Sequence, residues 1–140
     1  MIDFNINMID AQYLNDRSIN EAKKIKKNKS FILSGRSYDD LLTRTRQGHA
    51  AEVFLIEWCG FIDDIRDYHD VCHGDNTPVE VKVIGSVEYL DLNLERWAWD
   101  KINNPWKDWP DELMIWKNKY PDPEYKFLGH YKWSKNKWKK

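Results

Sequence analysis

The hydrophobic and polar positions along the chain change between a helical period and a strand-like period. Three segments place apolar residues at the spacing of an α-helix, namely 10–29, 38–58 and 91–102. Ser37 precedes the second segment as an N-cap, and Gly60 is placed to end it. The second half of that helix, HAAEVFLIEW, is apolar on most sides, which predicts that it is buried against a sheet.

Shorter apolar runs predict strands. The clearest is 79–84, in which apolar and polar residues alternate. The turn-forming stretch 74–78 joins it as a hairpin to a strand or two within 61–71. Two further runs, 112–116 and 125–133, follow the last predicted helix. The order of elements predicts an α/β fold, in which a mixed central β-sheet is flanked by helices.

The chain is expected to form one domain. Its 140 residues are enough to bury a single core, and no internal repeat or low-complexity tract is present. We expect residues 1–140 to comprise a helical N-terminal segment, 1–36, the α/β core and a basic C-terminal tail, 134–140. The tail is expected to fray, because it is rich in lysine and lies at the terminus.

Charge is balanced in total but segregated along the sequence. The formal net charge is −1, so bulk charge does not direct the chain toward nucleic acid. No acid follows Glu124, whereas lysines do, and a second basic cluster lies within 23–29. The acids gather in the middle, within 63–75. The high content of lysine, asparagine and isoleucine would suit a small phage protein.

The two cysteines do not form a disulfide framework, and the stretch MIDFNINMID lacks the basic-then-apolar pattern of a signal peptide. No apolar run approaches the roughly 20 residues needed to cross a bilayer. We therefore expect a cytoplasmic protein without membrane contact.

Charged side chains occur where the pattern predicts burial. In the strand 79–84, Glu80, Lys82 and Ile84 share one face, since successive side chains point to opposite sides. Glu52 lies in an apolar stripe of the second helix, and Asp70 ends the segment before the hairpin turn. Burying charge is costly unless it is paired or bound to a metal, so these positions form a hypothesis for a site.

A helix carrying Glu52, then Asp70, then Glu80-Val81-Lys82 resembles the PD-(D/E)XK nuclease superfamily of restriction enzymes, junction resolvases and phage nucleases. In that family an acid on a core helix precedes an aspartate at a strand end, and E-x-K follows on the next strand. The resemblance spans about 44–133, and RQGHAAEVFLIEW is similar to the G-x-x-A-E helix of small members. One departure is His69, which stands where the family often has proline.

The resemblance implies a restriction-endonuclease-like core (α-β-β-β-α-β) and a Mg²⁺-dependent endodeoxyribonuclease, with Mn²⁺ as a substitute. Asp70 and Glu80 would hold the metal, the carbonyl of Val81 would complete its shell, and Glu52 would reach it directly or through water. Lys82 would orient or deprotonate the attacking water, or stabilise the phosphate. The implied partner is DNA, and cutting both strands with one site per chain calls for a homodimer.

The chemistry of phosphodiester hydrolysis supports the same residues. Hard cations held by carboxylate oxygens lower the pKa of bound water and neutralise charge that develops at phosphorus. A lysine two residues along the same strand face adds a positive charge at that phosphate. The neighbouring cation also keeps the acids ionised.

Contacts with nucleic acid would come from basic side chains, which follow phosphates, and from aromatic ones, which stack on bases. Four tryptophans, 106, 109, 133 and 138, form a possible DNA-facing set. The alternative is that tryptophans 97, 99 and 116 are core and the others cap its edges, and for 97 and 116 we expect the core. For position 138, core and contact with nucleic acid or a partner both stay open. The candidate contacts are Arg44, Arg46, Lys132, Lys135, Lys137 and Trp138.

Other functions compete with the nuclease. One is a non-catalytic nucleic-acid-binding protein that keeps the fold, and another is a metal-dependent hydrolase of a different phosphate ester. A zinc site at His69, Cys72 and His73 lacks the paired spacing of structural zinc sites. His69-Asp70 is also found in HD phosphohydrolases, which need an all-helical scaffold. Asp64 or Asp75 could replace Asp70 as the ligand.

Overall fold

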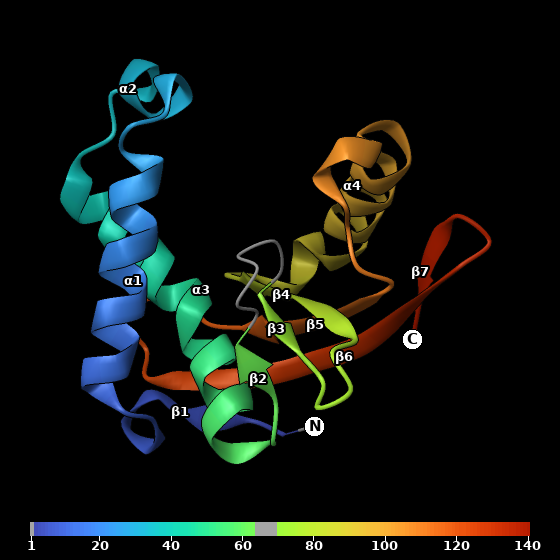
Figure 1. Ribbon diagram of the computed structural model, residues 1–140, viewed down its shortest axis with the longest axis horizontal. Coiled ribbons are helices and arrows are strands. Elements are labelled where there is room, and N and C mark those ends of the chain that lie inside the picture. The colour runs from blue at the N-terminus through green and yellow to red at the C-terminus, as the bar shows by residue number, and fades with distance from the viewer. Residues whose placement is uncertain (1, 64–69) are drawn as a thin grey trace.

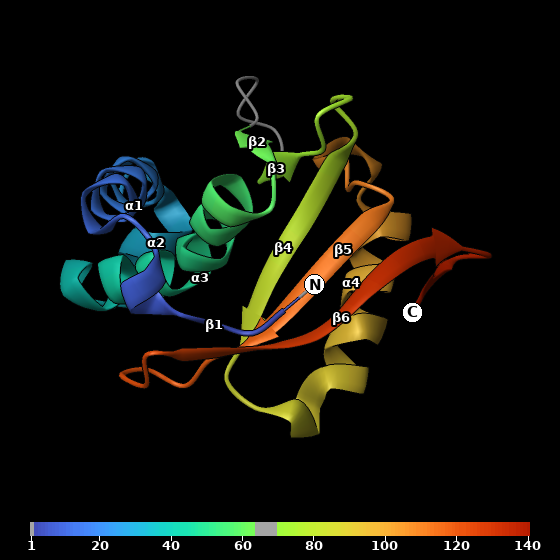
Figure 2. The ribbon, with the colours of Figure 1, turned by 90° about the horizontal axis from the view of Figure 1, so that it is seen from below.

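A curled, mixed β-sheet with helices on both faces forms the body of the protein (Figures 1 and 2). This computed structural model describes residues 2–63 and 70–140. The prediction of a mixed α/β fold with helices flanking a central sheet is confirmed.

The sheet has seven strands in the order β1-β6-β5-β4-β3-β2, and β7 pairs with β6. Among the strand pairs of the described residues, only β4 and β5 run parallel, and α4 connects them; the other pairs are antiparallel. The strands are β1 (Phe4–Asn5), β2 (Ile62–Asp63), β3 (Val71–Cys72), β4 (Pro78–Ile84), β5 (Glu112–Lys117), β6 (Glu124–Ser134) and β7 (Lys137–Lys139).

Four α-helices and three short 3-10 turns complete the described part of the chain. Figure 1 shows α1, α2 and α3 on one side of β3 and β4, and α4 on the other. The helices are α1 (Ala11–Ile25), α2 (Lys29–Ser34), α3 (Tyr38–Trp58) and α4 (Leu90–Asn103), and the 3-10 turns are η1 (Ile6–Met8), η2 (Val87–Tyr89) and η3 (Pro105–Lys107).

Two apolar cores lie on the two faces of the sheet. On β4, Val79 and Val81 pack into the core shared with α3, whereas Ile84 packs into the core beneath α4. The same alternation on β5 places Met114 in the core shared with α3 and Ile115 in the core beneath α4. Because side chains alternate along a strand, the even-numbered positions of β4 point toward α4.

The predicted boundaries of α3 are confirmed by its caps. The hydroxyl of Ser37 accepts a hydrogen bond from the backbone N–H of Asp40 at 3.1 Å, which satisfies one of the free donors of the first turn. The helix is continuous to Trp58, and Gly60 follows with a φ of 75°, a left-handed conformation that suits glycine after a helix end. This long helix carries Glu52 into the interior.

The prediction that the tail 134–140 frays is wrong. β6 continues to Ser134 and turns through Lys135 and Asn136, whose φ angles of 51° and 63° are typical of a tight hairpin turn. β7 then pairs with β6, and Trp138 is buried against Trp133. Burial of this indole ring anchors a segment whose lysines suggested disorder.

The N-terminal segment also differs from its prediction as one helix over 10–29. α1 ends at Ile25, and a separate helix, α2, begins at Lys29 and ends before Gly35, which has a φ of 71°. A strand over Phe4–Asn5 pairs with β6. None of the helices in the described part of the chain has the length and apolar character needed to span a bilayer.

Tryptophan placement agrees with the predicted core in part. Trp116 is fully buried, as expected, and Trp97 packs at the edge of the core beneath α4. Trp99 is 63% exposed, so the alternative that placed it in the core with them is wrong.

Candidate active site

Asp70 lies immediately before β3 and takes the place of a strand partner for β4. Its carboxylate oxygen Oδ2 accepts a hydrogen bond of 2.8 Å from the backbone N–H of Val81. The carbonyl of Val81 belongs to the same edge of the strand, because the N–H and C=O of one strand residue point to the same neighbour. Asp70 therefore sits at the point where the β3–β4 pairing ends.

Glu80 and Lys82 project from β4 on the face that α4 covers. Lys82 Nζ lies 3.3 Å from Glu80 Oε1, and both side chains are half-buried. The same ammonium lies 5.7 Å from the ring centre of Trp97 and 5.1 Å from that of Trp109. Two indole faces and one carboxylate thus fix the position of the charge on Lys82.

The antiparallel register of β3 and β4, in which Val71 pairs with Val79, brings Asp70 beside Glu80. Burial, followed by the charge of Glu80, raises the pKa of Asp70 from 3.8 to about 8. The N–H of Val81 and the charge of Lys82 oppose this rise. Two adjacent carboxyl groups therefore compete for ionisation, and a bound cation would relieve that competition.

Glu52 enters from α3, on the other side of β4, and is only 5% exposed. It stands in the buried run 50–55, where its neighbours are apolar. Burial, and then the charge of Asp70, raise the pKa of Glu52 well above its ordinary value, while Arg17 acts in the opposite direction. Glu52 therefore interacts electrostatically with Asp70, although it comes from the opposite layer.

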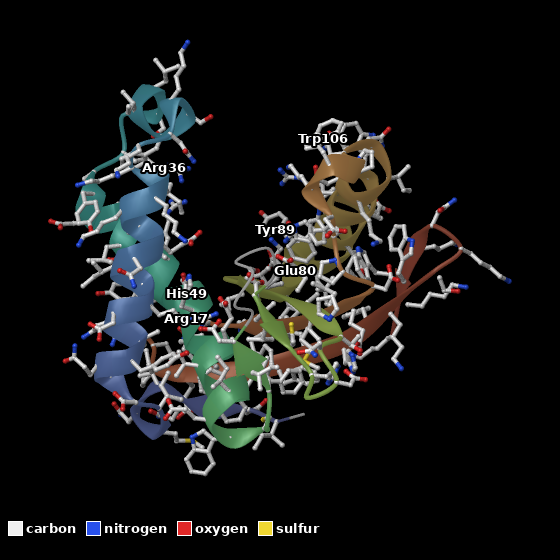
Figure 3. All side chains as sticks on the ribbon, in the orientation of Figure 1. Arg17, Arg36, His49, Glu80, Tyr89 and Trp106 are labelled. Carbon is white, nitrogen blue, oxygen red and sulfur yellow. The ribbon has the colours of Figure 1, made fainter. Side chains whose placement is uncertain are left out.

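Arg17 of α1 lies beside His49 of α3 (Figure 3) and contacts Glu52 and the backbone of Asp70. Its Nη2 lies 2.6 Å from Glu52 Oε1 and donates a hydrogen bond of 2.9 Å to the backbone oxygen of Asp70. Its Nη1 lies 2.5 Å from Asp63 Oδ1. One guanidinium group thus ties together α3, β2 and the chain that enters β3.

His49 completes the environment of Arg17. Its Nδ1 accepts a hydrogen bond of 2.9 Å from Arg17 Nε and lies 3.7 Å from Glu52 Oε2. Burial, and then the charge of Arg17, lower the pKa of His49 to about 4. The imidazole is therefore neutral near pH 7, with Nδ1 as the acceptor.

The sequence analysis missed Arg17 and His49. A signal for Arg17 was present, because it follows the buried Leu14 by three residues and so lies near the packed stripe of α1. His49 precedes Glu52 by three residues on α3 and shares its side of the helix.

The predicted meeting of three carboxylates at one point is not found within residues 2–63 and 70–140, where no three His, Cys, Asp or Glu side chains form a metal-ligand group. The reason is the division of the site between layers: Glu80 points to the α4 side, while Glu52 reaches Asp70 from the α3 side. Asp70 and Glu80 form the central pair.

The alternative ligands fall elsewhere. Asp75 lies in the exposed hairpin turn and accepts a hydrogen bond of 3.0 Å from the N–H of Thr77, as a turn residue does. His73 Nε2 lies 3.0 Å from Glu112 Oε2, and His130 binds the other oxygen of that carboxylate. Asp64 and His69 lie outside the described residues.

The predicted contacts with nucleic acid are spread over the molecule. Arg44 forms an exposed ion pair with Asp40 at 3.3 Å, and Arg46 donates a hydrogen bond to Asn15. The three lysines of the C-terminal hairpin, Lys132, Lys135 and Lys137, are exposed. Trp138 is 7% exposed, so stacking of this ring on a base is excluded in this conformation.

A comparison with known proteins does not extend these observations. No family model matches the chain, and neither a curated protein nor a solved structure does so. The candidate active site is therefore defined by its own geometry: Asp70 beside Glu80, Lys82 held over two indole rings, and Glu52 bound to Arg17.

Proposed function

We propose that the protein is a metal-dependent endonuclease that hydrolyses DNA phosphodiester bonds. The observation that carries the proposal is the adjacency of the Asp70 and Glu80 carboxyl groups, with Lys82 Nζ 3.3 Å from Glu80. The succession α3, β2, β3, β4, α4, β5 supports it, because the resemblance implies this order of elements. The proposal also rests on the resemblance to the PD-(D/E)XK superfamily.

The donor set fits a hard divalent cation such as Mg²⁺, for which Mn²⁺ can substitute. Asp70 is half-buried, and desolvation together with the charge of Glu80 raises its pKa to about 8. Two such carboxylates would be stabilised in their charged forms by a bound cation, since buried charge needs a partner of opposite sign. Asp70 and Glu80 would hold it, and the carbonyl of Val81 lies on the same edge. When bound, it would lower the pKa of a coordinated water and neutralise charge at phosphorus.

Lys82 has the properties of a group that binds the scissile phosphate. Its ammonium is half-buried, and Trp97 and Trp109 restrict its position. A positive charge held in place stabilises developing negative charge more than a mobile one, since it needs little reorganisation. We assign Lys82 to the phosphate and to the attacking water beside it.

Glu52 acts from the neighbouring layer. Its Oε1 is bound to Arg17, so Oε2 is the atom that faces other partners. The carboxylate would orient water near the bound cation, while Arg17 favours its charged form against the effect of burial. We assign Arg17 a positioning role, because it contacts both Glu52 and the backbone oxygen of Asp70.

A second candidate is a non-catalytic DNA-binding protein with a nuclease-like fold. One observation favours it, namely the absence of a three-residue metal-ligand group from the described residues. A homodimer belongs to the first candidate only, since two active sites are needed to cut both strands of a duplex.

Plasmid cleavage tests the proposal. Supercoiled DNA is incubated with the full chain in Mg²⁺, in Mn²⁺ or in EDTA, and nicked and linear products are measured on gels. We expect cleavage that depends on the cation. Asp70→Asn and Lys82→Met should each reduce the rate of cleavage at least about 100-fold. Asp75→Asn is the matched control, since this exposed acid lies on the same hairpin.

The two candidates predict different results for the wild-type protein. Cleavage that persists in both Asp70→Asn and Lys82→Met would show that the site is misassigned. DNA binding by the wild type without cleavage of any plasmid, linear or branched substrate would favour the non-catalytic protein.

A further inference from the structure

A hollow of about 420 Å³ lies on α4, outside the group of carboxylates. Four of its lining residues, at positions 93, 96, 97 and 100, share one side of the helix, because they follow the helical spacing of three and four residues. Trp99 forms a further wall and is 63% exposed. The hollow is large enough for a flat aromatic ring system.

The polar groups in this hollow are available to a ligand. Asn93 and Arg96 form no side-chain hydrogen bond or ion pair with any part of the chain that the structure describes. The third polar residue, Asp100, is already engaged, since its Oδ2 accepts a hydrogen bond of 2.8 Å from Trp109 Nε1. An amide and a guanidinium group beside indole rings can bind a base edge and a phosphate.

Trp97 connects the hollow to the candidate active site. Its indole ring lines the hollow and also lies 5.7 Å from Lys82 Nζ. Lys82 in turn lies 3.3 Å from Glu80. A strand whose phosphate lies at Lys82 therefore has its neighbouring nucleotide within reach of this side of α4.

We propose that this hollow binds an unpaired nucleobase of the nucleic-acid strand at the active site, so that the preferred substrate contains single-stranded or unstacked nucleotides. The base stacks on the indole of Trp99 or Trp97, and Arg96 binds the adjoining phosphate. The inference rests on the proposed function in taking nucleic acid as the ligand. A base inside a duplex is already stacked on both faces, so only an unpaired base gains this contact.

The test measures binding in EDTA, where no cleavage is expected. A fluorescein-labelled 12-nucleotide single strand and the same strand in a duplex are titrated with the full chain, and fluorescence anisotropy is followed at several salt concentrations. We expect Trp99→Ala to weaken single-strand binding about 10- to 100-fold and duplex binding much less. Arg96→Ala should reduce the slope of log affinity against log salt by about 0.7.

Trp58→Ala is the matched control, because Trp58 is 58% exposed and lies at the far end of α3. The inference is overturned if the wild type does not bind the single strand, or if both Trp99→Ala and Arg96→Ala bind it as the wild type does. It is also overturned if Trp99→Ala changes only the mass measured by light scattering, which would make this side of α4 an interface between copies.

Failure of this inference and failure of the proposed function give different results. Plasmid cleavage in Mg²⁺ together with unchanged single-strand binding by Trp99→Ala overturns the inference alone. Loss of single-strand binding in Trp99→Ala, without cleavage by the wild type under any cation, supports the hollow and overturns the nuclease.

Discussion

Replacement of Arg17 by methionine removes the guanidinium group that pairs with a deeply buried acid, Glu52. Glu52 is 5% exposed, and Arg17 Nη2 lies 2.6 Å from its Oε1. The substitution also deletes the hydrogen bond to the backbone oxygen of Asp70, which lies 2.9 Å from the same nitrogen. Methionine keeps much of the apolar stem, so the loss is mainly that of charge and hydrogen bonds.

Removing one partner of a buried ion pair typically costs about 3–5 kcal/mol, because the remaining charge is left without compensation. The pKa of Glu52 is already raised by burial and by Asp70, and loss of Arg17 raises it further. For a domain of about this length, 1 kcal/mol corresponds to roughly 2–4 °C in melting temperature. We therefore expect Arg17→Met to melt roughly 10 °C below the wild type.

Urea unfolding followed by circular dichroism measures the free energy of unfolding for Arg17→Met, Glu52→Gln and the double variant. The double variant should recover at least about 2 kcal/mol relative to the sum of the single effects, because it leaves no unpaired buried charge. Arg44→Met is the control, since its ion pair with Asp40 is exposed and should contribute less than about 1 kcal/mol. Additive effects, or a loss in Arg17→Met no larger than in Arg44→Met, would refute this interpretation of Arg17.

Three further predictions concern titration, the C-terminal hairpin and its lysines. Folding raises the pKa of Asp70 from 3.8 to about 8, so between these pH values the folded state binds more protons than the unfolded state and the free energy of unfolding falls as pH rises. Urea unfolding at pH 5 and pH 8 should show a smaller fall in Asp70→Asn than in the wild type. An equal fall in both proteins would contradict the prediction. Trp138→Ala should destabilise the fold by about 3 kcal/mol in the same assay, whereas a frayed tail would leave stability unaltered. Replacing Lys132 and Lys137 by alanine should lower the salt dependence of duplex binding, measured by anisotropy, if these lysines contact phosphates.

Local patterns were sufficient to predict the elements that carry the site. Ser37 at the start of α3 and the alternating valines of β4 depend only on nearby residues, and both predictions are confirmed. The alternation of β4 also explains why Glu80 and Lys82 project to the same side.

Features that depend on packing between distant segments could not be predicted in the same way. Arg17 lies in a polar helix, and a charged side chain there is ordinarily solvated; only the packing of α1 beside α3 brings it to Glu52. The separation of Glu52 from Glu80 by β4 likewise depends on which face each helix covers.

The C-terminal hairpin illustrates how composition can mislead. Lysines around Trp138 suggested a disordered tail, but the ring contacts Trp109 and Trp133 in a core contributed by other strands and by α4. Burial of one large aromatic side chain outweighs the solvation of its lysine neighbours, which remain exposed on the strand.

Manganese binding tests the central claim most directly, because it detects the cation without requiring any substrate. Free Mn²⁺ is measured by electron paramagnetic resonance during titration of the wild type, Glu80→Gln and Lys82→Met at pH 8. We predict a saturable site in the wild type that Glu80→Gln loses and that Lys82→Met keeps, since removing the ammonium group leaves both carboxylates in place. Equal binding by the wild type and Glu80→Gln, or no saturable binding by the wild type, would contradict a metal site at Asp70 and Glu80.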